Sequence, residues 1–153
     1  MMELIDRLTA WLHRPKDQPA PEPLPELDAR LALGALLVRL AKADHVYLFE
    51  ELEQIDRILA EREGLGPIDA AKMRATCERL EHAMPETEHF TALIREAVPY
   101  DERRSIVEAL WRVILADGIE QDQELIVAEL IEDQLGVERA HSKSAREAAE
   151  VIR

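Results

Sequence analysis

Cysteine, glycine and aromatic residues are all scarce in this chain of 153 residues. The single cysteine, Cys77, excludes a disulfide framework and a zinc site built from cysteines. Five glycines and eight prolines are too few for a collagen-like or low-complexity chain. No apolar run approaches the roughly 20 residues that span a bilayer, so the sequence predicts no transmembrane segment. The N-terminus has acids at Glu3 and Asp6 and no small-residue cleavage site, which is unlike a signal peptide, and we expect a cytoplasmic protein.

Basic residues are also few, because 19 Lys and Arg stand against 32 Asp and Glu, giving a formal net charge of −13. Phosphate binding depends on Lys and Arg, so this balance predicts no nucleic-acid partner. It favours metal cations or a basic protein as partners.

What the chain has in abundance is leucine and alanine, with 21 of each. Both residues favour helices, and no stretch alternates apolar and polar residues for long enough to predict a strand. The sequence therefore predicts an all-α fold. Apolar spacing and the Gly and Pro positions place seven helices in one domain over residues 26–153, at about 27–43, 49–63, 67–83, 87–97, 101–116, 122–135 and 138–152.

Two segments precede this domain. Residues 1–13 are predicted to form a short amphipathic helix, and residues 14–25 hold five prolines and are predicted to be an extended linker. The amphipathic helix has three uses open to it: folding back on the domain or exchanging in a homodimer, binding in the groove of a partner, or touching a membrane surface.

A weak internal repeat relates the two halves of the domain. The segments 40–44 and 113–117 both end an apolar helix in Ala-Asp, lie 73 residues apart, and are followed by an acidic helix. Glu51 and Glu124 each stand seven residues after the aspartate of their copy. The repeat predicts a bundle built on a duplicated helix-turn-helix unit. We call residues 44–51 the first corner and residues 117–124 the second corner.

The negative charge is concentrated at these corners. Residues 44–63 hold seven acids and two bases, and residues 117–138 hold eight acids and no base. Asp117 is at a helix C-terminus, where the dipole disfavours an anion by up to about 1 kcal/mol. Carboxylates are the usual ligands of Ca²⁺, Mg²⁺ and Mn²⁺, so one hypothesis is a divalent cation bound by Asp44, Glu51, Asp117, Asp122 and Glu124, with Glu120 nearby. The alternative is a solvated turn in which Asp122 caps the following helix.

The spacing of the second corner is not that of an EF-hand loop, which needs oxygens at positions 1, 3 and 5 and a glutamate at position 12. Two Glu-x-x-His pairs, Glu86 with His89 and Glu138 with His141, fall near predicted helix starts and not in mid-bundle, where di-iron sites are built. No catalytic residue and no enzyme are predicted. Trp111 is expected to be a packing residue, and Cys77 is expected to be an ordinary helical cysteine.

The run Leu-Trp-Arg-Val-Ile-Leu-Ala-Asp-Gly at 110–118 and Leu-Gly-Val at 135–137 resemble the TerB-like tellurite-resistance family, over about residues 27–153. The family is similar in fold to the helical N-terminal domain of membrane-anchored DnaJ-type co-chaperones. The resemblance implies a compact seven-helix domain, an acidic metal-binding surface and a role in tellurite or metal stress without known catalysis.

The first corner departs from the family pattern. His45 stands where the second corner has Gly118, and Phe49 stands where it has Asp122. The first turn is therefore apolar, which keeps a second hypothesis open: an interaction module of the co-chaperone type, whose acidic face docks a basic partner.

Overall fold

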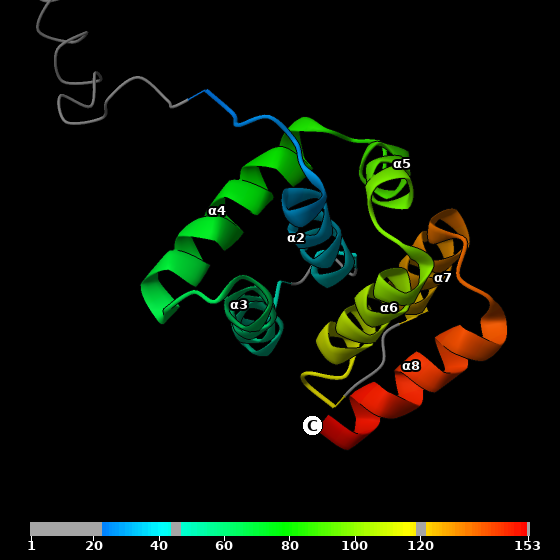
Figure 1. Ribbon diagram of the computed structural model, residues 1–153. Helices are drawn as coiled ribbons and strands as arrows, with labels where there is room; N and C mark the ends of the chain where they lie inside the picture. Colours follow the sequence, from blue (N-terminus) through cyan, green and yellow to red (C-terminus); the bar gives the residue numbers. More distant parts are fainter. Residues whose placement is uncertain (1–22, 44–46, 119–121, 153) are drawn as a thin grey trace, which may run out of the picture.

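The computed structural model describes residues 23–43, 47–118 and 122–152. Within these ranges the chain forms helices and no strand, which confirms the all-α prediction. None of the described helices combines the length and the hydropathy needed to cross a membrane. The predicted N-terminal helix and most of the proline linker lie outside the described residues. The helices are α2 (Ala29–Ala41), α3 (Phe49–Glu63), α4 (Pro67–Ala83), α5 (Glu88–Ala97), α6 (Tyr100–Ile114), α7 (Asp122–Leu135) and α8 (Arg139–Ile152) (Figure 1).

Local signals explain where the helices begin and end. The Asp28 carboxylate accepts a hydrogen bond from the Leu31 amide at 2.8 Å, so α2 begins two residues later than its apolar pattern suggests. Gly64 ends α3 with a left-handed φ of 64°, and Pro67 begins α4. Helix α6 ends at Ile114, two residues earlier than predicted, and a turn follows from Leu115.

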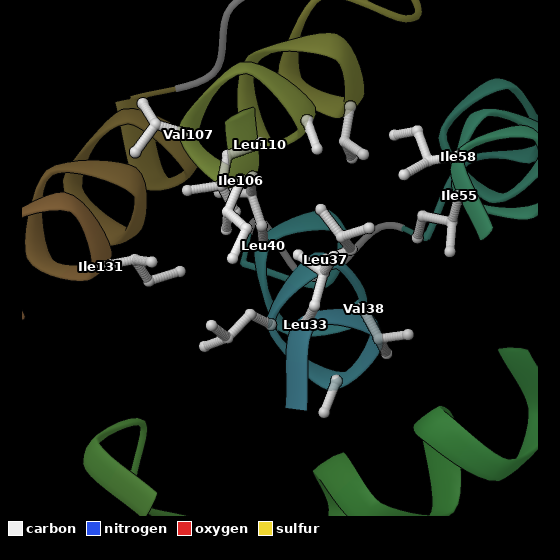
Figure 2. Packing of buried hydrophobic residues seen from close by; sticks show 14 of the residues in the cluster. Leu33, Leu37, Val38, Leu40, Ile55, Ile58, Ile106, Val107, Leu110 and Ile131 are labelled. Carbon is white, nitrogen blue, oxygen red and sulfur yellow. The ribbon is translucent and has the colours of Figure 1, made fainter. Parts of the chain in front are cut away.

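Helix α2 is the centre of the domain. Ten of its thirteen residues are buried, and α3, α4, α5, α6 and α7 all pack against it. Figure 2 shows Leu33, Leu37 and Val38 of α2 among side chains from the surrounding helices, including Ile55, Ile106 and Ile131. Helix α8 lies outside this arrangement and packs on α6 (Figure 1).

The buried face of α7 differs from the one that its apolar residues predict. The pattern favours Leu125, Ile126, Leu130 and Ile131 as the buried set, but Ile126 is 61% exposed and Leu130 is 46% exposed. The buried residues are Glu124, Ala128, Ile131 and Leu135. In α3 likewise, Glu51 is buried together with Ile55 and Ile58, while Leu52 is half-buried. In both helices a glutamate of the first turn therefore points toward the core.

Close packing of α2 against α4 depends on Gly34. A Cβ atom at this position would overlap the sulfur of Cys77, which is buried at the facing point of α4. Burial raises the pKa of the Cys77 thiol to about 12, so this cysteine is a neutral packing group. The expectation that Cys77 is an ordinary helical residue agrees with this position.

The substitution Gly34→Ala is expected to destabilise the fold by about 1–3 kcal/mol, because a methyl group inserted into a full core forces its neighbours apart. Adding Cys77→Ala in the same chain should restore part of this loss by removing the sulfur. Urea denaturation of the single and double variants measures the coupling. The control is Gly66→Ala, where a Cβ would meet nothing within 4 Å. A Gly34→Ala variant as stable as this control would contradict the packing argument.

Candidate metal centre at the acidic corners

The structure describes most of the predicted ligands. Asp44 and Glu120 lie outside the described residues. Asp117 is half-buried in the turn after α6, and Asp122 is exposed as the first residue of α7. Asp122 therefore stands inside the helix whose start it was predicted to cap, where its charge still favours the positive end of the helix dipole.

The two repeat-related glutamates occupy the same place in their helices. Glu51 is the third residue of α3, Glu124 is the third residue of α7, and both side chains are 0% exposed. Both take part in polar or electrostatic interactions. Glutamate is almost never fully buried unless it is paired, so two such residues at equivalent positions mark both corners as specialised.

The described acids do not assemble a complete metal site by themselves. Among the residues that the structure describes, no group of three or more His, Cys, Asp and Glu side chains is placed to hold a metal ion. In chemical type, however, the corners fit a hard cation, because every side-chain donor in the predicted set is a carboxylate oxygen. Asp117, Asp122 and Glu124 are all described and are not placed as such a group, so their role as ligands stays a prediction.

The first corner is chemically different from the second. Tyr47 packs against the core, and burial raises the pKa of its phenol above the usual range. Arg74 of α4 reaches this region and bonds Asp56 and Glu78, each at 2.6 Å. Phe49 begins α3 with 70% of its surface exposed. The two aromatic residues that the sequence indicates for this turn therefore differ, because the Tyr47 ring is half-buried and the Phe49 ring is exposed.

Beside the second corner is a cavity of about 450 Å³ between α3, α6 and α8. Arg112 lines it and donates hydrogen bonds to both carboxylate oxygens of Glu61, at 2.8 and 3.3 Å. This contact lowers the pKa of Glu61. Arg57 also lines the cavity. Because Glu61 neutralises Arg112, Arg57 leaves the lining with one net positive charge, which is unfavourable for a metal cation.

A family model described as tellurite resistance protein TerB matches residues 30–147, which is more than half of the chain. The chain belongs to the TerB family. The match covers both corners and all seven described helices in whole or in part, and it confirms the family that the sequence resembles. No curated protein and no solved structure matches the chain.

One polar cluster was not predicted from the sequence. Trp111, expected to be a packing residue, is 8% exposed, and its indole Nε1 donates a hydrogen bond to Glu132 at 3.0 Å. The two residues come from α6 and α7 and are separated by 21 positions. Neither residue stands in a recognisable motif, so only the packing of α7 on α6 brings them together.

The substitution Glu124→Gln is expected to stabilise the metal-free protein by about 1 kcal/mol, because it removes one buried carboxylate from a segment whose acids repel one another when no cation is bound. The matched control is Glu129→Gln, on the same helix, where the side chain is 67% exposed and the change should be small. Urea denaturation in the presence of a chelator measures both. Equal stability of the two variants would contradict a specific role for the buried carboxylate.

Proposed function

We propose that this TerB protein is a non-enzymatic binder of a divalent cation, which is Ca²⁺, Mg²⁺ or Mn²⁺, and acts in the response to tellurite or metal stress. The site of the proposal is the second corner, with Asp117, Asp122 and Glu124 as ligands. Asp44 and Glu51 are the equivalent ligands of the first corner. The observation that carries the proposal is the burial of Glu51 and Glu124 at the same position of a repeated unit, inside the two acidic segments of a TerB chain.

Charge supports the second corner over the first. Eight acids and no base lie between Asp117 and Glu138, whereas the first segment includes two arginines and faces Arg74 of α4. Mutual repulsion among unscreened carboxylates is relieved by a bound cation. We therefore assign the stronger site to the second corner.

In this proposal, the protein side chains supply only part of the coordination shell of the cation. Ca²⁺ takes six to eight oxygens, including main-chain carbonyls and water, and Mg²⁺ keeps several of its own waters. Glu120, which lies next to these ligands in the chain, is the proposed additional carboxylate. Such a site binds and releases an ion, and we assign no catalytic residue to it.

Thermal unfolding with and without added cation tests the proposal. A saturating cation at about 100 times its Kd should stabilise the wild-type protein by about 2.7 kcal/mol. Ca²⁺, Mg²⁺, Mn²⁺ and Zn²⁺ are compared, and a hard cation should raise the Tm most. The variant Asp117→Asn/Glu124→Gln should lose the shift.

The control variant is Asp101→Asn/Glu102→Gln, which removes the same charge from two exposed residues at the start of α6. It should retain the full shift. Equal shifts in all three proteins would show that the cations act on bulk charge, and no shift in any would also overturn the proposed site.

A further inference from the structure

A second binding site lies between α7 and α8, away from the acidic corners. Both helices contact α6, and they are joined by a short turn at Gly136, which has a left-handed φ of 72° (Figure 1). Between them is a cleft of about 330 Å³, in the size range of small-ligand sites. Its apolar lining comes from Trp111, Leu125 and Val137.

The cleft already holds a guanidinium group from the chain itself. The Arg146 side chain of α8 lies over the Trp111 ring, with its Cζ atom 4.6 Å from the ring centroid. The edge of the same indole is fixed by its hydrogen bond to Glu132. An aromatic face beside a carboxylate is the arrangement that binds organic cations, and a planar guanidinium can both stack on the ring and bond the carboxylate.

The charges of the cleft match one such cation. Its lining has three acids on the α7 side and three bases on the α8 side: Glu129, Glu132, Asp133, Arg139, Lys143 and Arg146. Because the third base is Arg146 itself, moving this side chain into solvent leaves the lining with one net negative charge. A monovalent cation restores the balance.

The Arg146 side chain is 38% exposed, so part of it already meets solvent. Its ion pair with Glu150 has an N–O distance of 3.4 Å, and both side chains are more than a third exposed. Exposed pairs of this kind change an equilibrium constant by about fivefold or less, and an exposed cation–π contact by about two- to fivefold. Burial raises the pKa of Glu132, and a bound cation would favour its charged form.

We propose that the cleft between α7 and α8 binds an organic cation with a guanidinium group, which replaces Arg146 on the Trp111 ring and pairs with Glu132. The ligand class is an alkylguanidinium, either as a free small molecule or as the arginine side chain of a peptide. The proposal is independent of the metal site, because it uses none of the corner residues.

The indole N–H resonance of Trp111 reports this binding directly. The chain has two tryptophans, so Trp11→Phe leaves a single indole signal. In this background, ethylguanidinium and N-acetylarginine amide are titrated, with sodium chloride and ethylammonium as controls at equal ionic strength. We expect a saturable shift with the guanidinium compounds only. Much tighter binding of N-acetylarginine amide would indicate a peptide ligand, and similar binding of both would indicate a free small molecule.

Variants test each contact. Arg146→Ala should tighten binding by about two- to fivefold by removing the competing group. Arg139→Ala is the matched control, because it removes a base that lines the same cleft but is 92% exposed. Glu132→Gln should weaken binding by about tenfold or more. If Glu132→Gln fails to fold, as judged by circular dichroism, the comparison of Arg146→Ala with Arg139→Ala decides alone.

Three results would overturn the proposal. The first is the absence of a saturable shift up to tens of millimolar in both wild type and Arg146→Ala. The second is an equal shift with ethylammonium. The third is an Arg146→Ala variant that binds no more tightly than Arg139→Ala.

Discussion

Burial of α2 on all sides is the constraint on which the rest of the domain depends. A helix surrounded by five others can have only apolar or small residues along most of its length, and α2 meets this condition with Leu, Ala, Val and Gly34. The surrounding helices are then positioned by how closely each can approach it. Gly34 permits one of these approaches, because it leaves room for the Cys77 side chain of α4 against α2.

Arg39 is a largely buried charged residue of α2, and its contacts hold the end of α4 and the start of α5 together. Arg39 is 12% exposed and extends from the last turn of α2 to the segment between these helices. It donates to the Glu81 carboxylate at 3.1 Å, to the Glu81 carbonyl at 3.0 Å and to the Thr87 hydroxyl at 3.1 Å, and its guanidinium lies over the Phe90 ring. One cation thus satisfies carbonyl and carboxylate oxygens at the end of α4 and fixes the start of α5.

The sequence was sufficient to predict the helices because Gly and Pro residues mark where several of them begin and end. Gly64 and Pro67, for example, separate α3 from α4 where the pattern indicates. The family resemblance was likewise confirmed by the match over residues 30–147. The buried face of a helix was harder to predict than the residues at which the helix begins and ends. Ile126 and Leu130 fit an apolar stripe, yet Glu124, Ala128 and Ile131 have the spacing that meets α2 and α5, so the glutamate is buried and the two larger residues are exposed.

For the candidate site, the sequence predicted which residues to consider but not which of them are buried. Seven-residue spacing after each Ala-Asp identifies Glu51 and Glu124, but burial depends on how α3 and α7 pack, which no local pattern encodes. The Trp111–Glu132 contact also depends on packing, since the two residues are 21 positions apart and lie on different helices. The metal hypothesis for Asp44, Glu51, Asp117, Asp122 and Glu124 accordingly stays a prediction, supported by donor chemistry and by the equivalent burial of the two glutamates.

Titration of the metal-free protein with Mn²⁺, followed by the electron paramagnetic resonance signal of the free ion, tests the central claim most directly. The account predicts saturable loss of the free-ion signal with wild type and with Asp101→Asn/Glu102→Gln, and little loss with Asp117→Asn/Glu124→Gln. Mn²⁺ that stays free in the presence of the wild-type protein, or that binds equally to all three proteins, would contradict a cation site at the second corner.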